Sequence, residues 1–363
     1  MIGTKPLPRK PNITSDSKKI HARIISWYDK HRRILPWRAQ PGSVPDPYSI
    51  WLSEIMLQQT TVATVKDYYQ NFIMRWPSIR HLAQAPLEEV LAAWAGLGYY
   101  ARARNLHACA RQIYEHDHGR FPKSEDELRK LPGIGPYTAA AISAIAFDRP
   151  CVAVDGNVER IMTRLHTIDT PPKKNKKIII EKSQLLASSK RPGDFVQALM
   201  DLGATICTPK NPQCLVCPIK SYCLAFQQDK AHLYPRKEIK PKKPKRQAAI
   251  FILHYERNIL IQKQPNHGIF GGMFIFPSTP FKQDTKLEAM LDHAPHKIKW
   301  RKLDGLIKHI FTHFVCESHV FIGKTRSDIK LGPDKKWISL EELPEIGLPA
   351  LMMKAAEKAN LLS

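Results

Sequence analysis

Two carboxylates in the first half of the chain have surroundings suited to acid–base chemistry. Glu54 lies in the largely apolar run IWLSEIMLQ (50–58). A carboxyl group among such neighbours loses hydration, which raises its pKa and suits it to act as a general acid. An exposed, salt-bridged glutamate is the ordinary alternative, and the apolar neighbours argue against it.

Asp155 lies in the run AVDGNVER (153–160), just ahead of a helix expected over 158–166. An aspartate at this position can serve simply as the helix N-cap. The helix N-terminus also favours its ionised form, which suits a group facing a developing cation. Glu54 and Asp155 together therefore predict acid–base chemistry at a glycosidic bond.

Four of the 7 cysteines lie in the segment 207–223, with the spacing C-x6-C-x2-C-x5-C. A disulfide-linked segment would need an oxidising compartment, so a metal or cluster site is the better interpretation. The spacing by itself leaves zinc open, although zinc sites more often show two C-x2-C pairs. The candidate ligands are Cys207, Cys214, Cys217 and Cys223.

The segment ELRKLPGIGPYTAAAI (127–142) predicts a helix, a glycine turn and a second helix. Gly133 and Gly135 allow the backbone to turn tightly, and N–H groups at a helix N-terminus bind anions such as DNA phosphates. An ordinary helical hairpin would have a similar pattern. The segment is therefore a candidate contact with nucleic acid.

These residues require a helical scaffold followed by a different kind of domain. Apolar residues recur at helical spacing through 18–206, whereas YPRKEIKPKKPKR (234–246) is basic, rich in proline and typical of a linker. Beyond it, strands are expected over 248–255, 259–263, 273–276, 311–316 and 319–322, with a closing helix over 350–362. The predicted fold class is multi-domain, all-α and then α+β. The expected parts are a flexible N-terminus (1–17), an all-α domain (18–228), a linker (229–246) and an α+β domain (247–363).

The charge of the chain predicts a nucleic-acid partner. Its 363 residues include 56 Lys and Arg against 33 Asp and Glu, a net charge of +23. Phosphate backbones are the commonest partner for such a balance, although a generally basic composition would produce it too.

No apolar run reaches the roughly 18 residues of a membrane span, and the N-terminus lacks the apolar segment of a secretory signal. We expect a monomer in a reducing bacterial cytoplasm, associated with the nucleoid, while an organelle transit peptide stays open.

Taken together, these motifs resemble the MutY family of adenine DNA glycosylases, in the helix-hairpin-helix glycosylase superfamily. The resemblance covers nearly all of 20–230. It also includes the runs LPWR (35–38), SEIMLQQT (53–60), GLGYY (96–100) and ALMDLGA (198–204). It implies a 4Fe–4S cluster held by the four cysteines. It also implies a duplex substrate with adenine opposite 8-oxoguanine or guanine.

The family's chemistry implies a role for several residues of this chain. Adenine would be flipped out of the duplex and protonated by Glu54, which would then activate the attacking water. Asp155 would stabilise the oxocarbenium sugar or trap it covalently, with Tyr137 and Asn157 orienting it. The implied adenine pocket consists of Arg33, Trp37, Arg38, Leu57 and Asp201, where some relatives carry Glu at position 201. The implied contacts with the duplex and the lesion are Gln59, Thr60, Leu97, Tyr99, Gly133, Gly135, Phe311, Thr312 and His313.

The last part of the chain, from about 246 onward, resembles the Nudix-like C-terminal domain of the same family. Nudix hydrolases hold Mg²⁺ with a clustered R-E-x-x-E-E, and nothing like it follows GGMFIFP (271–277). Nucleotide hydrolysis is therefore not expected. In the family this domain reads 8-oxoguanine through a loop that matches Phe311-Thr312-His313, with Thr312 where serine is usual.

Two other functions remain as alternatives. An endonuclease III-like glycosylase and lyase needs a nucleophilic lysine just after the hairpin glycines, where this chain has Pro136-Tyr137-Thr138. A non-catalytic, redox-sensing DNA-binding protein would explain the charge, the hairpin and the cysteines. It would not require Glu54 and Asp155 together with Tyr137 and Asn157. A monofunctional glycosylase is the predicted activity.

Overall fold

The computed structural model describes residues 13–238, 241–283 and 286–362. The chain divides into two compact units. Unit 1 comprises the described residues up to Ile73 and from Gln112 to 238, and unit 2 comprises Met74–Arg111 and the described residues from 241 onward. No helix in the described ranges is long and apolar enough to cross a membrane.

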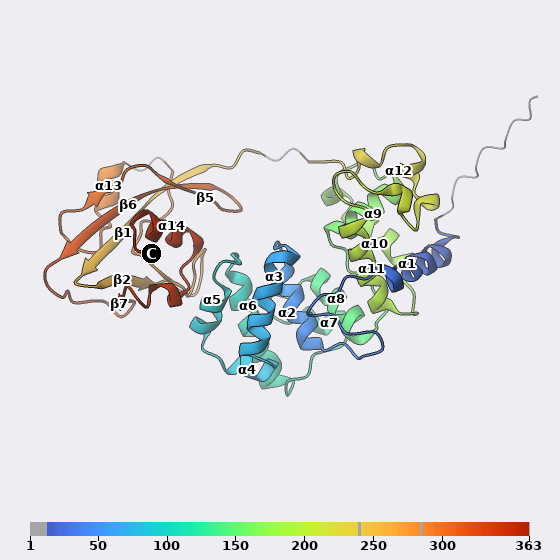
Figure 1. Ribbon diagram of the computed structural model, residues 1–363, viewed down its shortest axis with the longest axis horizontal. Helices are drawn as coiled ribbons and strands as arrows, with labels where there is room; N and C mark the ends of the chain where they lie inside the picture. Colours follow the sequence, from blue (N-terminus) through green and yellow to red (C-terminus); the bar gives the residue numbers. More distant parts are fainter. Residues whose placement is uncertain (1–12, 239–240, 284–285, 363) are drawn as a thin grey trace, which may run out of the picture. The chain divides into compact units, whose positions relative to one another are not determined.

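All regular secondary structure among the described residues of unit 1 is helical (Figure 1). Its α-helices are α1 (Ser17–His31), α2 (Pro47–Leu57), most of α3 (Val62–Arg75), α7 (Glu125–Leu128), α8 (Pro136–Phe147), α9 (Gly156–His166), α10 (Lys176–Gln184), α11 (Pro192–Thr205) and α12 (Leu224–Gln227). The described residues of unit 1 also form four short 3-10 helices: η1 (Pro172–Lys174), η2 (Cys214–Val216), η3 (Lys220–Tyr222) and η4 (Ala231–Leu233).

Helix α8 is buried on all sides and packs against α2 and α11. Its interior is rich in alanine, which keeps the helix narrow and lets its neighbours approach closely. On α11, Gly193 lies so near that an added Cβ would come within 2.8 Å of the Ala144 carbonyl oxygen. Close packing of this kind fixes the start of α8 relative to α2, because neither helix can shift without a clash.

The core of unit 1 continues around α9, which lies beside α10, α11 and α12 (Figure 1). Apolar side chains from α1, α9 and α11 form one cluster, which includes Ile24, Ile161, Leu165, Leu199 and Leu202. Cysteines of the segment 207–223 pack on its edge. The segment is therefore attached to the same core that carries Asp155.

Unit 2 contains a mixed sheet of seven strands, in which β3-β2-β1-β6-β4 form the main order, β5 also pairs with β6 and β7 pairs with β2. Only β1 and β6 are parallel, with Lys245 opposite Val315 and Tyr255 opposite Thr325. The strands are β1 (Lys245–Tyr255), β2 (Asn258–Lys263), β3 (Phe274–Ile275), β4 (Arg301–Lys302), β5 (Ile307–Ile310), β6 (Val315–Thr325) and β7 (Lys335–Ser339).

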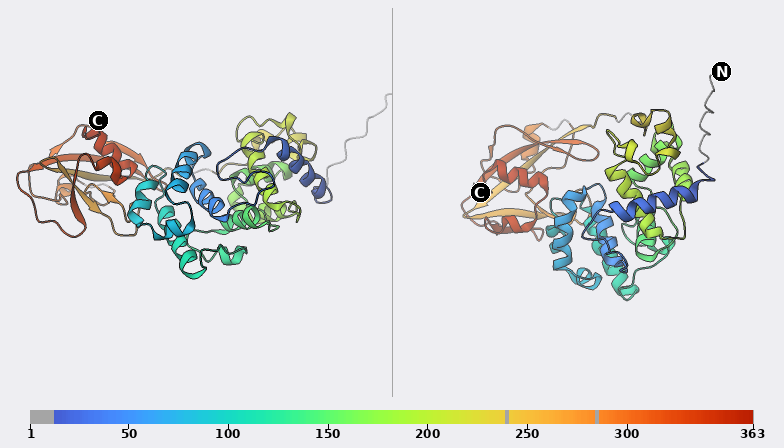
Figure 2. Two further views of the ribbon diagram at one scale, coloured as in Figure 1. Left: turned by 60° about the horizontal axis from the view of Figure 1, so that its bottom comes forward. Right: turned by 45° about the vertical axis from the view of Figure 1, so that its right-hand side comes forward.

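Helices cover this sheet. Met290 of α13 (Leu287–Leu291) packs with Ala249, Phe251 and Phe321. Helix α14 (Ala350–Lys358) lies against β5, as Figures 1 and 2 show. A 3-10 helix, η5 (Leu343–Ile346), precedes it.

Unit 2 also includes α4 (Ile79–Gln84), α5 (Leu87–Trp94) and most of α6 (Ala101–His116). The Arg104 guanidinium donates to the Gly271 carbonyl at 2.8 Å, and Lys263 of β2 forms an ion pair with Glu88 of α5. These contacts join α5 to strand β2 and α6 to the loop that contains Gly271.

The predicted fold class is confirmed, and several details of the prediction are wrong. The runs 311–316 and 319–322 are not two strands: β6 is one long strand, and Phe311 to Phe314 form the turn before it, closed by a hydrogen bond from the Phe311 N–H to the Phe314 carbonyl at 2.9 Å. The expected strands 248–255 and 259–263 leave three residues between them, but the turn between β1 and β2 has only two, because Asn258 already pairs with Tyr255. β4, β5 and β7 were missed, and α14 ends at Lys358.

The expected domain boundaries stay predictions. The two units differ from them, since 74–111 is grouped with the sheet instead of with the rest of 18–228. Within the expected linker 229–246, the described residues include η4 and the first two residues of β1. Most of the expected flexible N-terminus, 1–17, lies outside the described residues, and α1 begins at Ser17.

Candidate functional site

Glu54 lies in the middle of α2, which begins at Pro47 because Asp46 caps it by accepting hydrogen bonds from the Tyr48 and Ser49 N–H groups. The Glu54 side chain is buried among apolar neighbours and is 6% exposed. Burial raises the pKa of Glu54 to about 7; the Tyr137 hydrogen bond and the Arg38 charge oppose the rise, and the Asp155 charge adds to it. The predicted rise in pKa is confirmed. Near neutral pH this carboxyl group exists in both protonation states.

Tyr137, the second residue of α8, donates its hydroxyl hydrogen to Glu54 Oε2 at 2.9 Å. At the C-cap of α2, the Gln58 side-chain amide donates to the Thr138 hydroxyl at 3.2 Å. These two bonds tie α2 to the first turn of α8. Tyr137 donates to Oε2 of Glu54, so the other carboxyl oxygen, Oε1, receives no hydrogen bond from Tyr137.

Asp155 is the N-cap of α9, as the sequence predicted. Its Oδ1 accepts hydrogen bonds from the Asn157 and Val158 N–H groups at 2.9 and 2.8 Å, and its Oδ2 accepts from the Asn157 side-chain amide at 2.7 Å. Three donors therefore hold this carboxylate in one orientation. Its charge reaches Glu54, so the structure brings the two predicted carboxylates into one site.

A hydrogen-bonded chain connects Asp155 to the cysteine segment. The Arg160 Nη2 donates to Asn157 Oδ1 at 2.8 Å and to the Gly203 carbonyl at 2.7 Å, while its Nε donates to the Cys207 carbonyl at 2.6 Å. An added Cβ at Gly203 would lie 2.4 Å from the Asn157 Cβ, so only glycine fits there. Arg160 and Gly203 thus position Asn157, which in turn orients Asp155.

The residues expected to form an adenine pocket include an ionic cluster. Asp201 of α11 accepts from the Arg33 backbone N–H at 2.9 Å and from Arg33 Nε at 2.6 Å. It also accepts from Arg38 Nη1 and Nη2, each at 2.7 Å. Burial alone raises the pKa of Asp201, but the hydrogen bonds and charges of the two arginines outweigh it and hold the pKa below its ordinary value.

The two other residues expected to line the adenine pocket, Trp37 and Leu57, also lie in unit 1. Trp37 is buried and meets Tyr69 edge-to-face, with the ring centroids 5.4 Å apart. Leu57 is half-buried at the end of α2. Arg38 contributes to the field at Glu54, which connects this set to the carboxylate pair.

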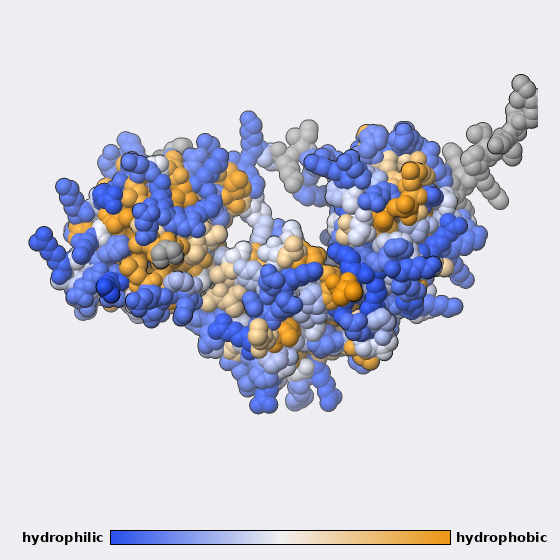
Figure 3. Space-filling view, in the orientation of Figure 1, coloured by the Kyte–Doolittle hydropathy of each residue, from blue (hydrophilic) through white to orange (hydrophobic). Residues whose placement is uncertain are grey.

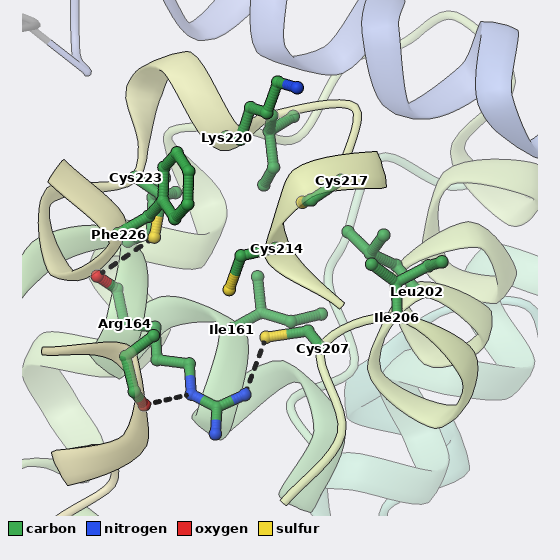
Figure 4. Close-up of a pocket in the computed structure, with 13 residues that line it drawn as sticks. Ile161, Arg164, Leu202, Ile206, Cys207, Cys214, Cys217, Lys220, Cys223 and Phe226 are labelled. Atoms are coloured by element: carbon green, nitrogen blue, oxygen red, sulfur yellow. Dashed lines mark hydrogen bonds between the residues drawn. The ribbon is translucent and has the colours of Figure 1, made fainter. Parts of the chain in front are cut away.

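The four cysteines predicted as ligands line one cavity in unit 1 (Figure 4). Its other walls are mainly apolar and include Ile161, Leu202 and Phe226. No group of three or more His, Cys, Asp or Glu side chains among the described residues is arranged to hold a metal ion. The thiols therefore surround a common space without closing on a single point.

The chemistry of this cavity fits an anionic cluster. Arg164 is 1% exposed, and its Nη1 donates to Cys207 Sγ at 3.2 Å (Figure 4). Its Nη2 is buried and has no hydrogen-bond partner in the described structure. A buried cation with an unused donor requires a negative partner, and a cluster with four thiolate ligands supplies one.

The same segment exposes apolar side chains. Leu215 and Val216 are 75% and 63% exposed, and Figure 3 shows an apolar patch on the part of unit 1 around α12. Three further cysteines lie outside this segment. Cys109 and Cys316 are buried, and Cys151 is half-buried.

The glycine hairpin has the predicted form. Gly133 has a φ of 76°, which favours glycine, and Gly135 is the N-cap of α8, where an added Cβ would meet nothing within 4 Å. Both glycines are exposed. Gln59, with a φ of 58°, is exposed after α2, and Thr60 next to it is half-buried.

In unit 2, the predicted lesion-contacting residues differ in exposure. Tyr99 and the loop 311–313 line one cavity, and Thr312 and His313 are exposed. Phe311 is half-buried, with its ring centroid 4.7 Å from that of Phe314. Leu97 is 5% exposed, so its side chain does not project as a wedge in this structure.

Sequence reasoning did not single out Arg160, Gly203 or Arg164. Arg160 follows Asn157 by three residues on the same helix, a spacing that brings side chains together. Arg164 is one further turn along the same face. Gly203 carried no local signal, because its need for glycine comes from a contact with another helix.

Comparisons with known proteins agree with this arrangement. Residues 52–185 match the family model of the HhH-GPD superfamily of base excision DNA repair proteins. Residues 207–223 match the iron-sulfur binding domain of endonuclease III, and residues 248–358 match the NUDIX domain. The cofactor is therefore a 4Fe–4S cluster, and DNA is the substrate.

Individual relatives extend the match along the chain. An adenine DNA glycosylase from Rattus norvegicus is 32% identical over 94% of this chain and 78% of its own length. Another, from Buchnera aphidicola subsp. Baizongia pistaciae, is 35% identical over 92% of this chain and 95% of its own length. A solved thermostable thymine-DNA glycosylase superposes with a TM-score of 0.53 at 29% identity and covers 60% of this chain and all of its own. With two relatives of this similarity aligned over most of both chains, the protein belongs to the family of adenine DNA glycosylases.

Proposed function

We propose that this protein hydrolyses the N-glycosidic bond of adenine mispaired with 8-oxoguanine or guanine in duplex DNA. The products are free adenine and an abasic site in an intact strand. The observation that carries the proposal is the pKa of Glu54, raised to about 7 by burial, on a side chain that lies within the field of Asp155. An acid and a carboxylate in opposed environments are what glycosidic cleavage needs.

Glu54 supplies the proton that turns adenine into a leaving group. Tyr137 donates to Oε2, so the transferable proton resides on Oε1. The flipped adenine accepts this proton on a ring nitrogen, and the electron pair of the breaking C1′–N9 bond goes to the base. Because the pKa of Glu54 lies near the working pH, a large fraction of the protein carries the proton, and the carboxyl group is acidic enough to transfer it to adenine.

Asp155 acts on the sugar. Breaking the bond leaves positive charge on C1′, and the Asp155 carboxylate stabilises that charge or bonds to C1′ transiently. Its three hydrogen bonds keep it in place as the charge develops. Glu54, now ionised, takes a proton from a water molecule as the water oxygen bonds to C1′, which restores the acid and completes the abasic site.

The residues after the hairpin support hydrolysis without strand cleavage. A lyase forms a Schiff base with an amine, and Pro136, Tyr137 and Thr138 carry none. The cluster takes no part in bond breaking. Cys207, Cys214, Cys217 and Cys223 would hold it, and when bound it crosslinks the segment whose Cys207 carbonyl accepts from Arg160.

Recognition of the opposite base is assigned to unit 2. Thr312 and His313 are exposed at the turn before β6 and share a cavity with Tyr99. The Thr312 hydroxyl can donate and accept hydrogen bonds, which suits the edge of 8-oxoguanine. We assign duplex contacts to Gln59, Thr60 and the hairpin glycines, which the structure leaves exposed or half-buried, and a monomer as the working form.

Base release from three duplexes tests the proposal. Adenine is placed opposite 8-oxoguanine, guanine or thymine, and free adenine is measured under single-turnover conditions without alkali. Release is expected from the first two duplexes and not from the third, and Glu54→Gln is expected to release none. Glu181→Gln, which changes an exposed carboxylate on α10, is the matched control and should behave as the unaltered protein. No release from any duplex would rule the proposal out.

A further inference from the structure

The carboxylate of Asp201 is saturated by hydrogen bonds from the protein. Its side chain is fully buried, and each of its oxygens accepts two bonds from Arg33 or Arg38 at distances of 2.6 to 2.9 Å. A carboxylate offers about four acceptor sites in total. All of them are occupied, so none remains for a base in the pocket.

This occupancy conflicts with a direct contact between Asp201 and adenine. The 6-amino group of adenine is a donor, and its ring nitrogens are acceptors. Asp201 could receive the amino group only by releasing an arginine, which would leave a buried charge without its partner. The two arginines, by contrast, carry the donors that ring nitrogens require.

Arg33 and Arg38 divide the available donors unequally. Arg38 directs both Nη atoms at Asp201, and its side chain is 8% exposed. Arg33 uses its Nε for Asp201, and its side chain is 26% exposed. Its Nη atoms have no hydrogen-bond partner among the described residues. Arg33 is therefore the member of the cluster with donors left for a ligand.

We infer that Asp201 is a positioning residue that never touches adenine and that acts by fixing Arg33 and Arg38. The inference rests on the proposed function, since it concerns the same pocket. It departs from the expectation that Asp201 lines the pocket as a direct contact.

A comparison of two bases separates the two roles. Single-turnover rates are measured for the unaltered protein and for Asp201→Asn, on duplexes carrying adenine or purine, which lacks the 6-amino group. If Asp201 acts only through the arginines, the substitution lowers both rates by the same factor, about 100-fold for a shift of about 1 Å in the donors. If Asp201 accepts from the amino group, the loss on purine disappears, and that result would overturn the inference.

A pH profile excludes a merely structural effect. Three charged or polar groups face Glu54: Arg38 from the loop before α2, Tyr137 from α8 and Asp155 from the N-cap of α9. Removing the Asp201 charge leaves Arg38 uncompensated, which favours ionised Glu54. The high-pH limb of the rate profile should therefore move to lower pH in Asp201→Asn. An unmoved limb would contradict the coupling through Arg38.

The matched control is Asp194→Asn, which removes another carboxylate of α11, bonded to Arg191 at 2.7 Å and not among the groups that shift the pKa of Glu54. This control should change neither the single-turnover rates on adenine and purine nor the pH at which the rate begins to fall. If Asp201→Asn does not fold, Asp201→Glu keeps the buried anion and is compared on the same two bases, with equal losses expected. Absence of adenine release by the unaltered protein would instead refute the proposed function itself.

Discussion

Replacing Glu54 by glutamine is expected to stabilise the protein at alkaline pH. Folding raises the pKa of this carboxyl group from 4.5 to about 7, chiefly through burial. The folded state therefore holds the proton more tightly than the unfolded state. Stability from this group is complete below pH 4.5 and is lost as the pH rises through about 7.

The size of the effect follows from the shift. At 1.36 kcal/mol per pKa unit, a rise from 4.5 to about 7 costs the ionised form about 3 kcal/mol above pH 8. Glutamine carries no charge to bury, and its carbonyl oxygen can still accept from Tyr137. At pH 5 the same linkage leaves a difference of less than about 1 kcal/mol.

Thermal unfolding followed by circular dichroism at pH 5 and pH 9 measures this difference. For a unit of this size, about 3 kcal/mol corresponds to a melting temperature higher by roughly 6–12 °C at pH 9. Glu181→Gln, at an exposed position of α10, should show no difference at either pH. An equal melting temperature for Glu54→Gln at pH 9, or the same gain at both pH values, would refute the reasoning that burial raises this pKa.

Three further predictions concern the chemistry and its supports. The rate of adenine release should fall tenfold per pH unit above about 7, because Glu54 must be protonated to act; a rate that keeps rising would exclude it as the acid. Gly203→Ala should lower the rate at least tenfold and destabilise the protein by about 1–3 kcal/mol, because its Cβ would lie 2.4 Å from that of Asn157. Gly135→Ala, where a Cβ meets nothing within 4 Å, should leave the melting temperature unchanged. Arg164→Met should make the visible absorbance of the cluster decay faster in air, since it removes the donor to Cys207 Sγ; equal decay would show that this bond does not protect the cluster.

Local chemistry is what the sequence could predict. The apolar run around Glu54 predicts burial and a raised pKa, because a helix places its near neighbours around the side chain. Asp155 precedes a helical run, and a short acidic residue there is a recognisable cap. The cysteine spacing predicts a metal or cluster site, because the ligands are close along the chain.

Contacts between distant segments could not be predicted in this way. The saturation of Asp201 depends on two arginines from a loop more than 160 residues earlier in the chain. The short strands β4 and β7 have little apolar alternation of their own and form by pairing with β6 and β2. The requirement for glycine at 203 arises only when α11 meets α9. In each case the deciding partner lies far away in the sequence.

The most direct test of the account measures free adenine and strand breaks in one reaction. Stoichiometric protein is incubated with a duplex carrying adenine opposite 8-oxoguanine, without alkali and in the presence of borohydride. Hydrolysis by Glu54 and Asp155, with no amine at positions 136–138, predicts one adenine released per duplex, an intact strand and no amine-linked adduct. Strand cleavage together with a borohydride-trapped adduct would contradict it and would assign the protein a lyase chemistry.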